Sequence, residues 1–285
     1  MRLITYQSPT GPRAAGLNGD GSCVDLNSAD RRVPHCIKKL LGQGDAGLRL
    51  AAEAARLGEP IAAEKLVLLP LVPNPEKVIC VGKNYAEHAR ETGSKPPDEP
   101  VFFSKFPSAV CGDGQPILLP PESNQVDYEA ELVAVIGRGG RNIPQSRALE
   151  HVAGYCCGND VSARDWQKGK PGGQWLLGKS FDSFAPIGPA LVTADDIPDP
   201  QCLDIKLRLN GRVMQQSNTR LMIFSVAELI AYVSRVCTLS PGDLLFTGTP
   251  EGVGFTRRPP VFLQAGDRVE VDIERIGSLG NPVKS

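Results

Sequence analysis

The chain has 285 residues, of which 41% are hydrophobic and 22% are charged, and its formal net charge is −1. These are the values of a globular protein with one large domain, or with a large and a small one, and they argue against a disordered or fibrous chain. Acidic and basic residues are interspersed, so we expect no nucleic-acid partner. No apolar run approaches the roughly 18 residues of a membrane-spanning helix, so we expect no membrane partner either.

The eight cysteines are scattered, and no two of them form a Cys-x-x-Cys pair. Zinc sites and secreted disulfide scaffolds use closer, paired spacings, so reduced and mostly buried thiols are expected. Residues 1–12 lack the charged segment and apolar core of a secretory signal. We therefore expect a cytoplasmic protein, or a mitochondrial one if a transit peptide has been removed.

Residues 1–70 are expected to form a small N-terminal α+β domain. Strand-like runs at 3–6 and 23–26 flank an Asp20-Gly21 turn, and an Ala/Leu-rich segment predicts a helix at 46–57. Prolines are then dense in residues 68–77, which predicts a linker because proline lacks an amide donor and restricts the residue before it. The boundary is placed there, with a second domain at 71–285.

The second domain is predicted to be rich in strands. Asn210-Gly211 is a strong signal for a hairpin, and Ser225 with Glu228 forms a capping box that predicts a helix at about 225–237. The strands do not alternate with helices as in a doubly wound fold, so we expect a β-rich α+β domain. The predicted strands are 77–81, 101–106, 117–119, 132–136, 203–209, 213–216, 244–246 and 268–273.

Three acidic residues lie where predicted strands begin or end. Glu129 and Glu131 point to the same side of a strand, because side chains alternate along it. Asp160 follows the apolar run 152–157, so it lies at a strand end, where loops build sites. Such oxygen donors suit magnesium, manganese or calcium better than zinc. Taken singly, the pair also fits a solvated strand edge, and Asp160 also fits a helix N-cap.

One of the three histidines has an acidic neighbour at helical spacing. His88 and Glu91 are three residues apart in a short predicted helix, so they share a face and come within hydrogen-bonding reach. A carboxylate orients an imidazole and raises its basicity, which is the arrangement of a general base. The alternative is an exposed polar helix without a catalytic role.

Together these segments resemble the fumarylacetoacetate hydrolase family over roughly residues 77–283. Five motifs occur in the family's order, and within the family they are most similar to the branch of fumarylacetoacetate hydrolase domain-containing protein 2. The motifs are VGKNYAEHARE (81–91), DYEAELVAVIG (127–137), NDVSARDWQ (159–167), WLLGKSFDSFAPIGP (175–189) and LLFTGTPEGVG (244–254).

The resemblance implies a fold, a site and an assembly. The fold is a mixed β-sandwich roll, and the assembly is a homodimer. The implied site has metal ligands, catalytic residues and substrate-binding residues. The implied ligands of Mg²⁺, or of Mn²⁺ or Ca²⁺, are Glu129, Glu131 and Asp160; the catalytic residues are His88, Glu91 and Lys179; the substrate-binding residues are Arg164, Gln167 and Thr249.

The site is expected to act on small-molecule 2-oxo acids by stabilising an enolate. The favoured reaction is C–C bond hydrolysis of an acylpyruvate or diketo acid. In it, His88 with Glu91 activates water, and Lys179 donates a hydrogen bond or a proton to the oxo oxygen. Two alternatives use the same site or the same fold. The first is a keto–enol tautomerase or decarboxylase of oxaloacetate, and the second is a non-catalytic metal-binding relative. The TGTP segment around Thr249 is also compatible with a plain turn.

Overall fold

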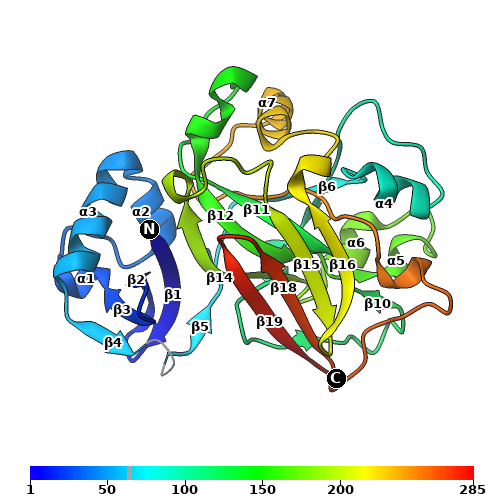
Figure 1. Cartoon of the computed structure of the whole chain (residues 1–285), viewed down its shortest axis with the longest axis horizontal. Coiled ribbons are helices and arrows are strands. Elements are labelled where there is room, and N and C mark those ends of the chain that lie inside the picture. Colours follow the sequence, from blue (N-terminus) through cyan, green and yellow to red (C-terminus); the bar gives the residue numbers. More distant parts are fainter. Residues whose placement is uncertain (63–65) are drawn as a thin grey trace.

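The computed structural model describes residues 1–62 and 66–285 and confirms the β-rich prediction (Figure 1). Within these residues the strands form sheets of 12, five and two members, and the largest sheet runs through the whole molecule. Helices are fewer and lie around the sheets. The short β10 (Val126–Asp127) and β13 (Ser162–Ala163) form the two-stranded sheet next to the site described below.

The large sheet has the strand order β4-β3-β2-β1-β14-β12-β11-β17-β6-β7, with β5 added at β1 and β8 added at β14. Its central strand β11 is buried along its full length, as expected of a continuous apolar run. The second-domain members are β6 (Val78–Gly82), β7 (Val101–Lys105), β8 (Val110–Cys111), β11 (Ala130–Ile136), β12 (Val152–Asn159), β14 (Ala185–Thr193) and β17 (Leu244–Phe246).

The N-terminal residues form strands and helices of their own at one end of this sheet. Helix α3 packs its small buried residues against α1, α2 and the strands, and it confirms the helix predicted at 46–57. The elements are β1 (Arg2–Ser8), β2 (Gly11–Leu17), β3 (Ser22–Asp25), α1 (Leu26–Ala29), α2 (Ile37–Leu41), α3 (Gly44–Leu57), β4 (Pro60–Ala62) and β5 (Leu68–Leu69).

The sheet is continuous across the expected domain boundary. Strand β1 pairs with β14 at Arg2–Val192 and Leu3–Leu191, and β5, in the proline-rich segment, pairs with β1. The division at residue 70 stays a prediction. Strands β2 and β14 were not expected from the sequence. Both contain proline and glycine, which obscure the strand pattern.

The five-stranded sheet has the order β16-β15-β18-β19-β9 and packs against the large sheet. The predicted hairpin at Asn210-Gly211 is confirmed, since both residues have the positive φ that a tight hairpin turn requires. Its strands are β9 (Ile117–Leu118), β15 (Asp204–Leu209), β16 (Arg212–Asn218), β18 (Arg268–Ile273) and β19 (Gly277–Lys284).

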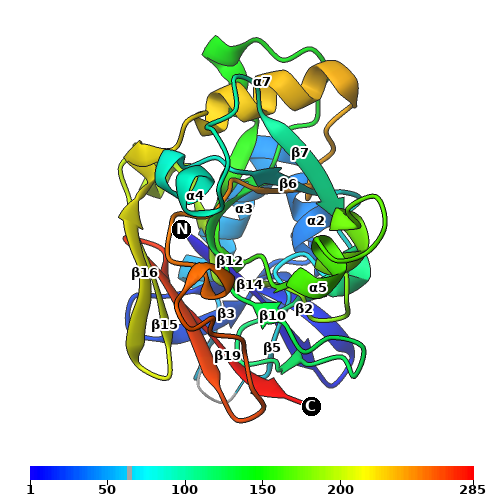
Figure 2. The same ribbon diagram turned by 90° about the vertical axis from the view of Figure 1, so that its right-hand side faces the viewer.

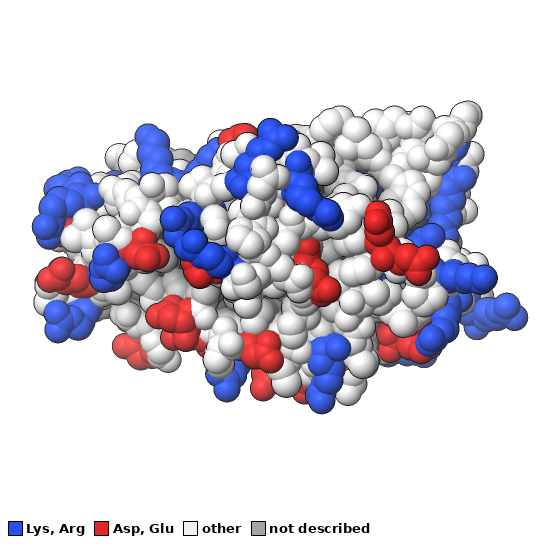
Figure 3. Space-filling model, turned by 90° about the horizontal axis from the view of Figure 1, so that it is seen from above, with Lys and Arg blue, Asp and Glu red and all other residues white. Residues whose placement is uncertain are grey.

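The helices of the second domain are short, apart from α7 (Val226–Val236). Ser225 and Glu228 form the predicted capping box, and the apolar face of α7 is buried. Charges of both signs are interspersed on the face that carries α7 (Figure 3). In the described residues no helix is both long and apolar enough to cross a membrane. The others are α4 (Ala86–Glu91), α5 (Arg164–Gln167), α6 (Trp175–Lys179) and the 3₁₀ turns η2 (Pro107–Ala109), η3 (Gln145–His151), η4 (Ala194–Asp196), η5 (Thr219–Leu221) and η6 (Gly254–Thr256).

Candidate active site

Glu129, Glu131 and Asp160 lie at the adjoining ends of β11 and β12. The register pairs Ala130 with Asn159, so the residues just beyond this pair are neighbours, and the Asp160 amide donates to the Glu129 carbonyl at 2.9 Å. One carboxylate oxygen from each acid lies within 4.8 Å of the other two, and all three residues are buried. The three carboxylates thus converge as expected, and neither a solvated edge nor a helix cap describes them. Their role as metal ligands stays a prediction.

Glu131 is the acid of this group that has no paired basic side chain in the described parts of the chain. Within residues 1–62 and 66–285, no basic side chain lies within 4 Å of its carboxylate, although Glu129 and Asp160 each have such partners. Burial and the charges of Asp160 and Glu129 raise the pKa of Glu131 well above its usual range. A buried carboxylate without a counter-charge is costly. The three hard oxygen donors therefore fit a divalent cation such as Mg²⁺ or Mn²⁺, which would supply that charge.

Lys179, at the end of α6, points between two of the acids. Its ammonium lies 2.8 Å from Oε2 of Glu129 and 2.7 Å from Oδ2 of Asp160. Burial lowers the pKa of Lys179, but the two carboxylates outweigh it and the net shift is upward, so the side chain stays charged. Helix α6, which carries Lys179, packs closely against α5 because Gly178 has no side chain. A Cβ there would lie 2.6 Å from the backbone nitrogen of Gln167.

His88 and Glu91 form the expected pair on α4. Nδ1 of His88 lies 2.8 Å from Oε1 of Glu91, and His88 is buried. The other oxygen of Glu91 accepts hydrogen bonds from the Gly252 amide at 3.0 Å and the Thr256 hydroxyl at 3.1 Å. The loop after β17 thus fixes the carboxylate, which in turn orients the imidazole.

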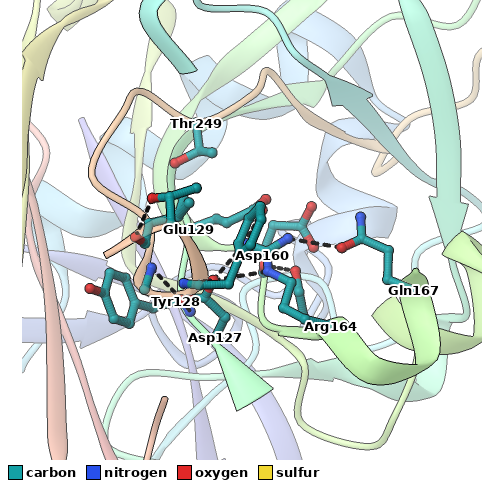
Figure 4. A network of polar contacts seen from close by, with 12 residues as sticks. Asp127, Tyr128, Glu129, Asp160, Arg164, Gln167 and Thr249 are labelled. Carbon is teal, nitrogen blue, oxygen red and sulfur yellow. Dashed lines mark hydrogen bonds and ion pairs between the residues drawn. The ribbon is translucent and has the colours of Figure 1, made fainter. Parts of the chain in front are cut away.

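Arg164 is held by protein groups on every side (Figure 4). Its Nε bonds Asp127 at 2.9 Å, its Nη2 lies 2.7 Å from Glu129, and its Nη1 donates to Gln167 at 2.9 Å. Asp127 also accepts from the amides of residues 254 and 255. The guanidinium therefore lies at the site as expected, and its contacts with Asp127, Glu129 and Gln167 fix its position.

Thr249 lies in the loop after β17, where Gln215 fixes it. Nε2 of Gln215 donates to Oγ1 of Thr249 at 2.8 Å, and its Oε1 accepts from the amide of Ala130 at 2.9 Å. Gln215 thereby connects this loop to the start of β11. It was not expected at the site, because it lies in the middle of a hairpin strand and no local motif marks it.

Lys105 is a second site residue that sequence reasoning missed. Its ammonium is fully buried and lies 2.7 Å from Oδ1 of Asp160, and it also donates to the carbonyls of Val161, Lys179 and Phe184. It ends an apolar strand and belongs to no acidic or histidine-containing motif. Only its burial beside Asp160 shows its role, which is to compensate one of the three acids.

These elements surround a cavity of about 150 Å³. Residues of α4, α5, β6 and β7 line it, and Figure 2 shows how these four elements are arranged. Of the predicted residues, His88, Glu129, Arg164, Gln167, Lys179 and Thr249 line the cavity. Glu91, Glu131 and Asp160 are not in its wall, but each contacts or neighbours a residue that is. The described structure thus gathers the nine predicted site residues in one region, and their individual roles stay predictions.

The family model of the fumarylacetoacetate (FAA) hydrolase C-terminal domain matches residues 77–284. The chain belongs to the fumarylacetoacetate hydrolase family. It is 48% identical, over 99% of its length and 91% of the other chain, to a Bos taurus protein named oxaloacetate tautomerase FAHD2A, mitochondrial. It is 42% identical, over 100% of its length and 97% of the other chain, to the fumarylacetoacetate hydrolase domain-containing protein 2 homolog of Dictyostelium discoideum. The expected branch of the family is therefore confirmed.

Solved structures of fumarylacetoacetate hydrolase relatives confirm the expected fold. A fumarylacetoacetate hydrolase from Exiguobacterium antarcticum superimposes with a TM-score of 0.87 at 36% identity, covering 100% of this chain and 99% of the other. A 5-carboxymethyl-2-hydroxymuconate delta-isomerase from Mycobacterium smegmatis gives a TM-score of 0.79 at 37% identity, covering 100% and 98%. The family is one of enzymes, and its named members include hydrolases and isomerases.

Proposed function

We propose that this protein is a divalent-metal-dependent tautomerase that interconverts the keto and enol forms of oxaloacetate. The observation that carries the proposal is that His88 and Lys179 line one small cavity beside Glu129, at the edge of the acidic cluster. The name of the bovine relative supports this substrate and reaction. C–C bond hydrolysis, which the sequence favoured, becomes the alternative, because the named relatives agree better with tautomerisation.

The acidic cluster is proposed to hold the metal through Glu129, Glu131 and Asp160. A bound divalent cation supplies electrostatic stabilisation for negative charge on the oxo oxygen of a 2-oxo acid. Glu131, which has no cationic side-chain partner among the described residues, is the ligand whose charge most needs it. Lys105 compensates Asp160 from the opposite side and stays outside the cavity wall.

His88 is proposed to move the proton. Tautomerisation of the keto form breaks the C3–H bond and forms an O–H bond at C2, so it needs a base near C3 and a proton donor near the C2 oxygen. Glu91 engages Nδ1 of His88, which leaves Nε2 for a ligand in the cavity that His88 lines. This assigns proton transfer at C3 to the imidazole.

Lys179 is proposed to donate a hydrogen bond at the C2 oxygen. Its raised pKa keeps it a proton donor at neutral pH, and its contacts with Glu129 and Asp160 fix its position. Arg164 and Gln167 position Glu129 and the cavity wall, and Thr249 lines the opposite side. These groups bind and orient the substrate, whereas hydrolysis would also require space for an attacking water.

The test is a direct comparison of three reactions with one preparation in Mg²⁺. Decay of the ultraviolet absorbance of enol-oxaloacetate follows tautomerisation, pyruvate release from oxaloacetate follows decarboxylation, and loss of an acylpyruvate follows hydrolysis. We expect tautomerisation to be the fastest. A chain that hydrolyses acylpyruvates but leaves the enol decay at its spontaneous rate would refute the proposal. Absence of all three reactions would favour the non-catalytic alternative.

A homodimer is proposed as the assembly. Phe106, Leu176 and Leu177 expose apolar side chains on the adjacent segment after β7 and helix α6, which supports an interface there. Light scattering on the purified chain tests the assembly. The location also stays a proposal, and the mitochondrial names of the relatives support the mitochondrial alternative over the cytoplasm.

A further inference from the structure

Two lysines at the cavity have no acidic partner among residues 1–62 and 66–285. Lys83 and Lys168 both line it, together with Arg164 and Lys179. Arg164 and Lys179 make ion pairs with the acids of the site, whereas Lys83 and Lys168 make none within the described parts of the chain. Positive charges that converge on a cavity without counter-ions favour an anionic ligand.

Lys168 is fixed beside an aromatic ring. Although the residue as a whole is exposed, its ammonium lies 3.7 Å from the centre of the Phe255 ring. The guanidinium of Arg164 lies 4.5 Å from the centre of the same ring. Partial burial, followed by the positive charges of Arg164 and Lys83, lowers the pKa of Lys168 to about 8, although Glu129 opposes this shift. Cations are therefore crowded here in the absence of a ligand.

Lys83 reaches the cavity from a strained turn. Its φ of 58° lies in the left-handed region, which is unfavourable for a residue with a Cβ. The next residue holds the turn in place, since Nδ2 of Asn84 donates to the carbonyls of Thr247 and Phe224, and its Oδ1 accepts from the Phe224 amide. Strain that neighbouring bonds enforce is typical of functional sites.

Lys168 and Phe255 also separate the cavity from a second hollow. Both residues, with Arg164, line a groove of about 660 Å³ whose other walls include Lys170 and Phe262. The cavity itself, at about 150 Å³, is smaller than the roughly 300–1,000 Å³ clefts that hold drug-sized ligands. The Lys168–Phe255 contact therefore forms part of the wall between the small cavity and the larger groove.

We propose that Lys83 and Lys168 bind the second carboxylate of a dicarboxylate 2-oxo acid, and that Lys168 on Phe255 excludes longer tails. The inference rests on the proposed function for the 2-oxo acid head group. The charge of Arg164 is already paired with Asp127 and Glu129, whereas the two lysines have no acidic partner in the described parts of the chain, so the distal carboxylate is assigned to them. Lysine suits this task, because its flexible ammonium acts as a point charge for an anion at the cavity mouth.

The test measures equilibrium binding rather than turnover. Oxaloacetate and 2-oxobutanoate have the same carbon skeleton, with a carboxylate in one and a methyl group in the other. Rapid tryptophan-fluorescence titration in saturating Mg²⁺ reports on the cavity, because Trp175 lines it. Variants Lys83→Met and Lys168→Met are compared with Lys170→Met, which lines only the groove.

We expect each cavity variant to weaken oxaloacetate binding about tenfold, and 2-oxobutanoate less than about twofold. Lys170→Met should change neither ligand by more than about twofold, and Lys168→Ala should tighten binding of 2-oxooctanoate. Equal loss of both ligands, or no loss of either, overturns the inference. If the wild type prefers oxaloacetate to 2-oxobutanoate, and this preference depends on Lys168, but it catalyses no tautomerisation, the proposed reaction is refuted and the inference about the lysines stands. If it binds neither, both fail.

Discussion

The ammonium of Lys105 lies 2.7 Å from the Oδ1 atom of Asp160, and neither side chain has any exposed surface. Lys105 lies 56 positions before Val161, whose carbonyl it bonds, and it also bonds the carbonyl of Lys179. One buried cation thus compensates a proposed metal ligand and holds the backbone of a proposed catalytic residue. Its burial lowers the pKa of Lys105, but Asp160 opposes that shift.

Replacing Lys105 with methionine should therefore destabilise the chain. The substitution leaves the buried charge of Asp160 without this partner, and loss of one member of a buried ion pair typically costs about 3–5 kcal/mol. Urea unfolding of Lys105→Met and of the exposed control Lys95→Met measures the difference in free energy of unfolding. A loss below about 1 kcal/mol in Lys105→Met would show that Asp160 does not depend on this contact.

The His88–Glu91 pair leads to a prediction about selectivity among reactions. His88→Asn should lower the rate of oxaloacetate tautomerisation by about 10²–10⁴-fold, the usual contribution of a general acid or base. Decarboxylation needs no base at C3, so any such side activity should be largely retained. His35→Asn, at an exposed histidine far from the acidic cluster in sequence, is the matched control. Undiminished tautomerisation in His88→Asn would exclude the imidazole as the proton carrier.

The lowered pKa of Lys168, about 8, predicts how binding depends on pH. The ammonium is charged below that pH and attracts a carboxylate, so affinity for oxaloacetate should be greatest near pH 7 and fall as the pH rises through about 8. Arg164 and Lys83 face Lys168 with positive charge, and Glu129 and Asp127 with negative charge. Fluorescence titration of wild type and Lys168→Met checks this. The same pH dependence in both proteins would assign it to another group.

The sequence predicted the parts of the site that belong to local motifs. Glu129 with Glu131, and His88 with Glu91, lie close in sequence, so the period of a strand or a helix places them together. The apolar run before Asp160 put that residue at a strand end, and the β11–β12 register then made it a neighbour of Glu129. The confirmed elements, such as α7 and the hairpin at Asn210, have equally local signals.

The sequence did not reveal the residues whose roles depend on distant contacts. Gln215 bonds Ala130 and Thr249, and Lys105 bonds Asp160, across long stretches of chain. A polar residue within a strand pattern does not show whether it faces solvent or a buried acid. The engagement of Arg164 by Asp127 was missed for the same reason, since the pairing of β10 with β13 brings them together.

Glu129, Glu131 and Asp160 are proposed to hold a divalent cation that the reaction requires. Isothermal titration of Mg²⁺ or Mn²⁺ into chelator-treated protein tests it, with Glu131→Gln as the variant and the exposed Glu53→Gln as its control. We predict one cation per chain in the wild type and in Glu53→Gln, and binding weakened at least about tenfold in Glu131→Gln, because one of three anionic donors becomes neutral. Metal-free Glu131→Gln should be more stable than metal-free wild type, since an uncompensated buried carboxylate is removed. Full tautomerase activity of the wild type in excess chelator, with no cation bound on titration, would contradict the account.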